Sequence, residues 1–491
     1  MLSTMNLNRF TWNRFFIMYR RPEMIIRIAK KEWKEQLREK RFLAAGLLMV
    51  LLFGAALISS KAYYEKEQDL RLQAQHGIEE NWLNQRDKNP HGAAHYGIYL
   101  FKPESRLALV DRGVNRYAGT AFFVEGHVRN EAQFRKIEDE TGLVRFGELT
   151  PAYILITLMP LFIILIGFNS FTKEREGGTW RMLQSHDVSL RKLLLGKWAG
   201  VAFTTFMLFI PLFILMGLII YNVSGIGEFS FTHYLILGAF YSLYYLVFIN
   251  LTLIVSWFSK RSGAAFITLL AIWIVAILVV PKLFVSAAQY LNPLPDTNTV
   301  AEMYREARAG GIDGHVPSSA RELEREVMEE YGVDRLEDLP FNFFGLRLQV
   351  GEEYDTKAYN YVFGHIHSVI SDQDALIRKG SLLSPFLPVR NLSMAMAYTD
   401  VDKHWDFSEA VELYRQDFVR YLNEDLMYSS RTGDTYLAGS DVWAAKPDFS
   451  YELPAMREVL TAQTGNLLLL FGWVGFSFLG LLTIRSTSEE S

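Results

Sequence analysis

Six long apolar runs are the feature that most constrains how this chain can fold. They are predicted at 42–60, 151–171, 199–221, 234–258, 264–282 and 464–484, and Lys282, at the end of the fifth, is the single Asp, Glu, Lys or Arg within them. About 20 apolar residues are long enough to cross the hydrocarbon core of a bilayer as a helix. Buried core helices of a soluble protein are the alternative, but runs of this length with charge-free cores recur six times. The sequence therefore predicts a polytopic α-helical membrane protein with six transmembrane helices.

The distribution of positive charge predicts the orientation of these spans. Nine Lys or Arg lie between positions 20 and 41, six lie between 173 and 197, and Lys260, Arg261 and Arg485 follow other spans. An excess of Lys and Arg in short loops marks the cytoplasmic side. We therefore expect 1–41, 172–198, 259–263 and 485–491 to be cytoplasmic, with both termini inside. The same reasoning places 61–150, the short turn 222–233 and 283–463 outside.

The two large outer inserts differ in charge, and both have the composition of folded segments. Residues 283–463 hold 16 Lys or Arg against 30 Asp or Glu, whereas 61–150 hold 13 against 14. Helices are predicted around Val300–Arg308, Ser319–Tyr331 and Ser408–Leu426, the last with Ser408 as its N-cap. Alternating apolar residues between Gly and Pro breaks in HYGIYLFKPESRLALVDRGVNRYAG predict irregular extended structure. We therefore expect a mixed α+β extracytoplasmic domain.

A basic amphipathic segment precedes the first span. In MIIRIAKKEWKEQLREKR, apolar residues recur at helical spacing and cations cover the other face. Such a helix is suited to lie in the headgroup layer of the membrane. The alternative is a positive flank that only orients the first span. The residues of the predicted interfacial helix are Ile26, Arg27, Ala29, Lys30, Lys31, Trp33, Lys34, Leu37 and Arg38.

The sequence carries no recognisable catalytic or nucleotide-binding motif. It lacks G-x-x-x-x-G-K-[ST], H-E-x-x-H and G-x-S-x-G, and it has no cysteine. The net charge of −4 implies no nucleic-acid partner. We therefore expect a non-catalytic chain that itself holds no cofactor.

Two histidine pairs have spacings that occur among metal ligands. His91 and His95 are four residues apart, and His365 and His367 are two apart. Either spacing can place two imidazoles on one metal ion, but neither motif contains a third ligand. We therefore expect structural or solvated histidines and no metal site.

The polarity of the spans indicates the energy source. A proton- or ion-coupled transporter normally carries an ionisable group within the membrane. Here Asn169, Asn250, several Ser and Thr, and a set of tyrosines supply the polarity of the spans. Active transport by this chain would therefore need a separate motor.

The link at 172–198 is crowded with charge although it joins two spans directly. Gly177 and Gly178 are expected to end a helix and Thr179 to cap the next one. The carboxylates of Glu174 and Glu176 are expected to orient backbone or to pair with Arg175 and Arg191. Such a link suits docking into a groove of a cytoplasmic partner, but a positive-inside loop without a partner remains an equal alternative.

Within this link, EREGGTWRMLQS followed by SLRKLLLGK resembles the coupling link of ABC-2 type permeases, which have the type V exporter-like fold. There E-x-E-x-G-T, a Leu-rich stretch and G-K form the coupling helix that docks on the ATPase. Trp180 stands where the family more often has Leu or a small apolar residue. The positions that match or lie within the pattern are Lys173, Glu174, Arg175, Glu176, Gly178, Thr179, Arg181, Leu183, Gly196 and Lys197.

Motifs outside the link extend the resemblance over nearly the whole chain. HYGIYLFKP, DRGVNRYAGTAFFVEGH, RFGELTPAYIL and SPFLPVRNLSMAMAYTD are similar to a bacterial subset with two large extracytoplasmic inserts, classed as a domain of unknown function. The resemblance implies an inner-membrane permease that exports cargo. It also implies cytoplasmic ABC ATPase subunits that hold ATP and Mg²⁺, and pairing with a second copy or a similar permease. The cargo is not implied.

Two other functions compete with transport. ATP-driven movement of the spans would reshape the outer domain and act on a periplasmic protein without a transport path. A membrane-anchored extracytoplasmic enzyme or sensor is the second alternative, and it would require a catalytic constellation outside.

Overall fold

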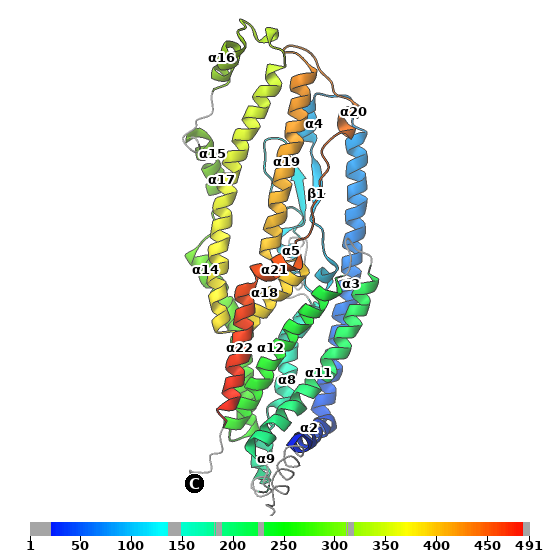
Figure 1. The fold of residues 1–491 in the computed structure, drawn as a ribbon, viewed down its shortest axis with the longest axis vertical. Helices are drawn as coiled ribbons and strands as arrows, with labels where there is room; N and C mark the ends of the chain where they lie inside the picture. Colours follow the sequence, from blue (N-terminus) through cyan, green and yellow to red (C-terminus); the bar gives the residue numbers. More distant parts are fainter. Residues whose placement is uncertain are drawn as a thin grey trace, which may run out of the picture.

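The computed structural model describes residues 21–135, 149–180, 182, 189–223, 230–310, 312 and 319–484. These residues form a long, predominantly helical molecule (Figure 1). The first part of the chain contains α2 (Arg21–Arg38), α3 (Lys40–Leu83), α4 (Pro90–Tyr96), β1 (Ile98–Phe101), η1 (Arg106–Leu109), α5 (Asn115–Ala118), β2 (Ala121–Val124), α7 (Pro151–Tyr153), η3 (Ile154–Leu158), α8 (Met159–Gly167), α9 (Thr172–Glu176), α11 (Leu190–Asn222) and α12 (Phe231–Phe258). The second part contains α13 (Ser262–Ile274), η4 (Val275–Val279), α14 (Val280–Leu291), α15 (Thr297–Gly310), α16 (Ala320–Tyr331), η5 (Leu336–Asp338), α17 (Phe343–Lys379), η6 (Gly380–Leu382), α18 (Phe386–Ala397), α19 (Val401–Ser429), α20 (Ser440–Ala444), α21 (Met456–Ala462) and α22 (Thr464–Leu482).

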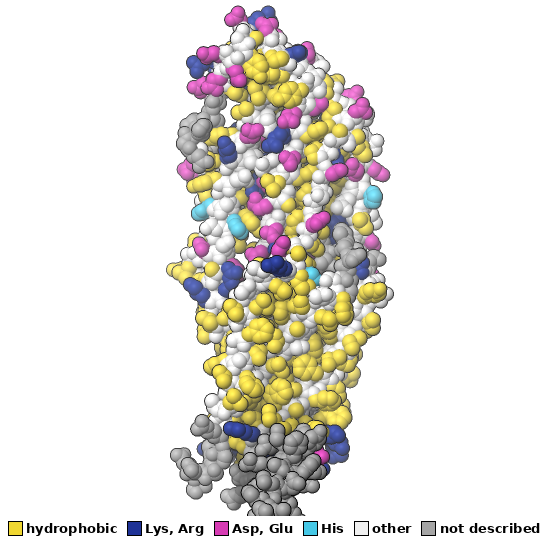
Figure 2. All heavy atoms as spheres, viewed as in Figure 1, with side chains coloured by type: hydrophobic (Ala, Val, Ile, Leu, Met, Phe, Trp, Pro, Cys, Tyr) yellow, Lys and Arg dark blue, Asp and Glu magenta, His cyan; other side chains and the backbone are white. Residues whose placement is uncertain are grey.

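Six helices among the described residues are long and apolar enough to cross a membrane, in agreement with the predicted helical membrane class. They are Lys40–Leu83, Pro151–Glu176, Leu190–Asn222, Phe231–Phe258, Ser262–Leu291 and Thr464–Leu482. Apolar side chains form a broad band over this part of the surface, with charged side chains above and below it (Figure 2). We call the end of the spans where α2 and α9 lie the basic end, and the helical assembly beyond the opposite end the distal domain.

Helix α3 belongs to both the span region and the distal domain. Its 44 residues reach about 66 Å at 1.5 Å per residue, roughly twice the thickness of the hydrocarbon core. In Figure 1 it runs from α2 to the level of α20. At its far end, Trp82 is fully buried, lies 5.1 Å from the ring of Phe418 and donates a 2.8 Å hydrogen bond to the carbonyl of Trp443. One continuous helix therefore connects the basic end with the distal domain.

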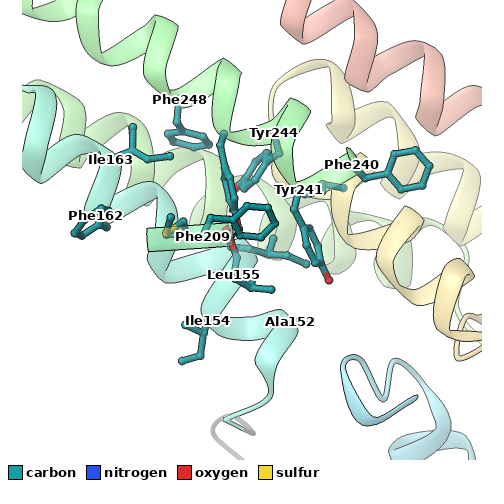
Figure 3. Packing of buried hydrophobic residues seen from close by; sticks show 14 of the residues in the cluster. Ala152, Ile154, Leu155, Phe162, Ile163, Phe209, Phe240, Tyr241, Tyr244 and Phe248 are labelled. Atoms are coloured by element: carbon teal, nitrogen blue, oxygen red, sulfur yellow. Dashed lines mark hydrogen bonds between the residues drawn. The ribbon is translucent and has the colours of Figure 1, made fainter. Parts of the chain in front are cut away.

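The second span contains the π turn η3, which ends two residues before Pro160. Proline has no backbone N–H, so Pro160 leaves carbonyls one turn earlier without a donor from the helix. Side chains of α12 replace it: the hydroxyls of Tyr244 and Tyr245 donate to the carbonyls of Ile156 and Leu155, each at 3.0 Å. Figure 3 shows the tyrosines of α12 and the apolar side chains of this segment packed together. An irregular backbone within the membrane is thus satisfied by protein.

The fifth span repeats this arrangement with the π turn η4 before Pro281. Here the hydroxyl of Ser384 donates to the carbonyl of Ala276. The helix continues past the proline as α14, so Pro281 lies within a helix extending to Leu291. The fifth span therefore continues beyond Lys282, where the predicted run ends.

Two long antiparallel helices, α17 and α19, form the centre of the distal domain. The backbone N–H of Asn342, before α17, donates to the carbonyl of Met427, near the end of α19, at 2.8 Å. Strands β1 and β2 form a two-stranded antiparallel ribbon, and Phe122 of β2 packs 5.4 Å from Phe407 of α19. Within the described residues, the distal domain is thus mainly helical with one two-stranded ribbon, and the mixed α+β domain stays a prediction.

The N-cap predicted at Ser408 is wrong. Helix α19 begins at Val401, and Asp400 is its N-cap, accepting a 2.7 Å hydrogen bond from the backbone N–H of Lys403. Ser408 lies two turns inside the helix and is buried. The first two turns of α19 have the same apolar spacing as the rest of the helix, so this spacing alone could not locate the first residue.

Two glycines of α17 predict different effects of the same substitution. A Cβ at Gly345 would lie 2.8 Å from the Cα of Met427, whereas a Cβ at Gly364 meets nothing within 4 Å. We expect Gly345→Ala to lower the free energy of unfolding by about 1–3 kcal/mol, because α17 and α19 must separate. Gly364→Ala should leave it unchanged or raise it by up to about 1 kcal/mol. Thermal unfolding in detergent measures both, and equal midpoints for the two variants would contradict this packing.

Candidate functional site at the basic end

Two glycines allow α2 to pack closely along the first turns of α11. A Cβ at Gly196 would lie 2.5 Å from the Cβ of Ile28, and a Cβ at Gly200 would lie 2.7 Å from the Cβ of Glu32. Any larger residue at either position would push α2 away from α11. The glycine of the G-K pattern therefore has a packing role in this chain.

Lys197, the lysine of that pattern, is fully buried. Its Nζ donates to Glu32 Oε1 at 2.6 Å, to the carbonyl of Ser170 at 2.6 Å and to Glu174 Oε1 at 2.9 Å. An ammonium group has three hydrogens, so these acceptors satisfy all of them. The acceptors belong to α2, to the end of the second span and to α9. Lys197 therefore joins α11 to three other segments.

This ammonium belongs to a cluster of six charges. Lys173 pairs with Glu35 and lies 3.6 Å from Glu32. Lys31 lies 3.4 Å from both Glu35 and Glu174. Three positive charges therefore face three negative ones. We call the following residues the ion cluster: Lys31, Glu32, Glu35, Lys173, Glu174 and Lys197.

Ion pairing compensates for the burial of part of the cluster. The side chains of Glu32 and Glu174 are 1% and 4% exposed, and a buried charge is tolerated only when it is paired and hydrogen-bonded. Burial lowers the pKa of Lys31, but Glu35 and Glu174 outweigh burial and raise it overall. Burial raises the pKa of Glu35, but Lys173 and Lys31 outweigh burial and lower it overall. Both groups therefore stay charged around neutral pH.

Arg175 and Glu176 attach α9 to the turn between α12 and α13. Arg175 Nη1 donates to the carbonyl of Ser259 at 2.9 Å and to that of Trp257. Glu176 accepts hydrogen bonds from the backbone N–H of Ser262 at 2.9 Å and from its hydroxyl at 2.6 Å. Residue Ser262 begins α13, so the carboxylate lies at a helix N-terminus, where anions are favoured. Movement of α9 is thus tied to α12 and α13 as well as to α2 and α11.

The partners predicted for the two carboxylates need one correction. Glu176 does orient backbone, but the partners of Glu174 are Lys31 and Lys197 rather than Arg175 or Arg191. Arg191 is exposed on the first turn of α11. The close approach of α2 and the burial of Lys197, which the link alone does not encode, decide this pairing.

The link turns away from α9 at its glycine pair, as predicted. Helix α9 ends at Glu176, and Gly178 has φ +68°, a left-handed conformation that favours glycine. The hydroxyl of Thr179 donates to the carbonyl of Glu174 at 3.3 Å, so it binds the preceding helix. Residues 176–179 are exposed. Arg181 and Leu183 lie outside the described residues.

Trp180, the departure from the family pattern, has a packing partner. Its ring lies 5.4 Å from the ring of Trp257 in an edge-to-face arrangement, and the guanidinium of Arg175 lies 5.4 Å from the Trp180 ring. The larger side chain thus fills the space between α9 and the end of α12.

The buried face of α2 differs from the face that the apolar spacing indicated. Glu32 and Gln36 are buried, whereas Ile26 is 51% exposed. The Nε2 of Gln36 donates to the carbonyl of Ile166 at 3.2 Å, and the hydroxyl of Thr204 donates to Gln36 Oε1. Of the predicted interfacial residues, Arg27, Lys30 and Lys34 are exposed and Trp33 and Leu37 are half-buried.

Sequence reasoning missed Glu32, Glu35 and Gln36 as site residues. Their signal was the recurrence of Ile28, Glu32 and Gln36 every four residues, which places them on one side of a helix. A helix face that contains a carboxylate and an amide is classed as polar, and therefore as exposed, when amphipathicity alone is considered. It is recognisable only once the buried lysine opposite is known.

The two histidine pairs of the distal domain lie in different surroundings. His91 and His95 of α4 are joined by His127, whose Nε2 lies 3.3 Å from that of His91. Burial and the neighbouring rings of His127 and His95 lower the pKa of His91 to about 4, whereas the hydrogen bond to Glu352 raises the pKa of His127. By contrast, His367 stacks on Trp405 at 4.6 Å, and His365 is exposed.

Six apolar helices with a charged cluster at one end define a polytopic helical membrane protein. The model of the ABC-2 family transporter proteins matches residues 26–331, and the chain belongs to this family. A second model, a domain of unknown function (DUF3526), matches residues 301–452. The expected family is thereby confirmed. No curated protein matches the chain by sequence.

Removal of the buried ammonium tests whether the ion cluster holds α2 on α11. Lys197→Met keeps the side-chain length but leaves Glu32 and Glu174 without their shared cation. We expect the free energy of unfolding to fall by about 3–5 kcal/mol, because breaking a buried pair leaves uncompensated charge. Thermal unfolding in detergent, followed by tryptophan fluorescence, measures the loss.

Two variants control this experiment. Arg191→Met removes an exposed cation from the same helix and should change stability by less than about 0.5 kcal/mol. The double variant Lys197→Met, Glu174→Gln removes one charge of each sign and should recover part of the loss. An unfolding midpoint of Lys197→Met equal to that of the wild type would mean that the cluster does not hold these helices together.

Proposed function

We propose that this chain is the membrane-spanning, non-catalytic subunit of an ATP-driven ABC exporter, and that cytoplasmic ATPase subunits dock on its link at 172–198. Membership of the ABC-2 family supports a permease that associates with an ATPase. The basic end faces the cytoplasm in this proposal, because Lys and Arg flank the spans there. ATP and Mg²⁺ are bound by the partner, and a second copy or a similar permease completes the complex.

The exposed part of the link is the proposed docking surface. Residues 176–179 are exposed, and Met182 is 58% exposed. In Figure 1, α9 lies near α2 at the lower end of the span region. An exposed apolar side chain at such a position is suited to enter a groove of a partner.

The observation that carries the proposal is the set of three hydrogen bonds made by Lys197. They connect the link to α2 and α11, while Arg175 and Glu176 connect it to the turn between α12 and α13. A displacement of the link by an ATPase would therefore act on several spans together. This arrangement is suited to convert a movement at the basic end into a rearrangement of the membrane region.

Helix α2 completes this unit at the membrane surface in the proposal. Ile26, Arg27, Lys30 and Lys34 are exposed while the opposite face packs on α11. An apolar residue among cations suits contact with lipid headgroups. Lipid is therefore proposed as a partner of this exposed face.

A cavity between the spans supports transport. Its volume is about 410 Å³, and it is lined by α12, α13, η4, the turn before α18 and α22. Its lining is mainly apolar, which suits a cargo with an apolar part. The lining residues are Phe248, Leu251, Thr268, Ala271, Ile272, Val275, Ala276, Leu383, Pro385 and Trp473.

Mechanical transmission is the second candidate, and the continuity of α3 favours it. The helix runs from the basic end to Trp82, which is buried in the distal core. Movement of the spans would therefore displace the distal domain, which faces the periplasm in this orientation and would act on a protein there. Both candidates require the same ATPase on the same link.

The docking proposal predicts loss of the ATPase when Met182 is replaced by aspartate. The tagged chain is purified from its native membrane in mild detergent, and ATP hydrolysis of the preparation is measured. We expect Met182→Asp to remove at least 90% of the co-purifying activity, because a charge enters an apolar contact. Met182 is exposed, so the permease itself should unfold at an unchanged temperature.

Leu437→Asp is the matched control, since Leu437 is 56% exposed and lies in the distal domain. It should retain the activity of the wild type. A wild-type preparation without ATP hydrolysis in any mild detergent would refute the motor, and equal loss in both variants would refute docking at the link.

A further inference from the structure

Three histidines from two segments meet at the surface of the distal domain. His91 and His95 are four residues apart in α4 and therefore lie on one side of it. His127 comes from the turn after β2 and approaches the same side. One ligand nitrogen of each ring lies within 4.8 Å of the others.

We propose that His91, His95 and His127 bind one divalent transition-metal ion, such as Zn²⁺, through their Nε2 atoms. The Nε2 of His91 lies 3.1 Å from that of His95 and 3.3 Å from that of His127. Zn–N bonds of 2.0–2.1 Å in a tetrahedral site separate two ligand nitrogens by about 3.3 Å. Two of the three nitrogen–nitrogen distances therefore match a shared tetrahedral ion, and the ligand atoms of His95 and His127 lie within 4.8 Å of each other.

Glu352 of α17 holds His127 in the orientation that a ligand needs. Its Oε1 lies 2.6 Å from His127 Nδ1 and accepts the backbone N–H of the same residue at 2.7 Å. Its other oxygen is held by Arg415 at 3.1 Å. A carboxylate on Nδ1–H fixes the tautomer whose Nε2 carries a free lone pair, as in carboxylate–histidine–metal sites.

His91 has a corresponding neighbour on its far nitrogen. Its Nδ1 is buried and makes, among the described residues, no hydrogen bond of normal geometry, and the same holds for Oδ1 of Asn423 of α19. Asn423 is close enough to interact with the ring. A small rotation that pairs the two atoms would place the proton on Nδ1 and leave the Nε2 lone pair towards the other histidines.

The donor set indicates the class of ion. Three imidazoles suit Zn²⁺, Cu²⁺ or Ni²⁺, whereas Mg²⁺ and Ca²⁺ prefer oxygen ligands. His95 is exposed, so a fourth position remains open to solvent. Three protein ligands with an open position are typical of exchangeable or reactive sites rather than closed structural ones.

An ion at this position would link the two inserts. All three ligands belong to 61–150, but the residues that support them, Glu352 and Asn423, belong to 283–463. Binding would therefore stabilise the association of α4 with α17 and α19. This inference does not rest on the proposed ATPase docking.

Titration of the full chain with Zn²⁺ tests the site. The protein carries a histidine-free tag, is purified in detergent, treated with EDTA and titrated by calorimetry. We expect one Zn²⁺ per chain and a raised thermal midpoint. His95→Ala should weaken binding on the order of 100-fold or more and abolish the thermal shift, because a ligand matters more than its supporting residues. His95 is exposed, so this variant should fold normally.

Further variants and probes separate the site from non-specific binding. His365→Ala removes an exposed histidine of α17 and should bind like the wild type. Glu352→Gln should weaken Zn²⁺ binding by about 10–100-fold, with its fold checked by circular dichroism. Co²⁺ should give the visible absorption of a tetrahedral complex in the wild type and lose it in His95→Ala. Wild-type affinity equal to that of His95→Ala would overturn the site.

Discussion

The burial of one ammonium group, that of Lys197, is the constraint on which the basic end depends. A charge that is removed from water must be paired and fully hydrogen-bonded, or it destabilises the fold by several kcal/mol. This requirement brings Glu32, Glu174 and the carbonyl of Ser170 to one point. Gly196 and Gly200 are needed because only glycine lets α2 approach closely enough to deliver Glu32. The G-K pair and the acidic residues of the link thus form one physical unit.

The spans satisfy most of their polarity within the protein. Tyr244 and Tyr245 donate to carbonyls freed by a proline, and Trp198 donates to Asn250 at 2.8 Å. Asn250 in turn donates to Ser477 of α22 at 3.0 Å. These groups therefore hold helices together. The described cavity between the spans is mainly apolar, so recognition of any cargo in it would depend on shape and apolar contact.

The sequence predicted what local chemistry determines and missed what depends on a partner. Apolar runs of span length predicted the six helices, and a glycine pair predicted the end of α9, because both follow from a few adjacent residues. The buried face of α2 could not be predicted, because amphipathicity assigns a charged residue such as Glu32 to the solvent-exposed face. His127 lies 32 positions after His95, and no periodicity connects a turn after a strand with a helix before it. The start of α19 was predicted too late, at Ser408, because the apolar spacing of a helix does not mark its first residue.

Helix α3 explains how the two ends of the molecule are physically related. At the basic end it is separated from α2 by one non-helical residue, Glu39, whose carboxylate pairs with Arg41. At the other end Trp82 is buried against Phe418 and Trp443. A continuous helix fixed at both ends resists bending, so a change in the position of α2 relative to α11 would reach the distal domain as a movement of α3. Both candidate functions require this coupling, and they differ in whether the membrane region or the distal domain performs the final step.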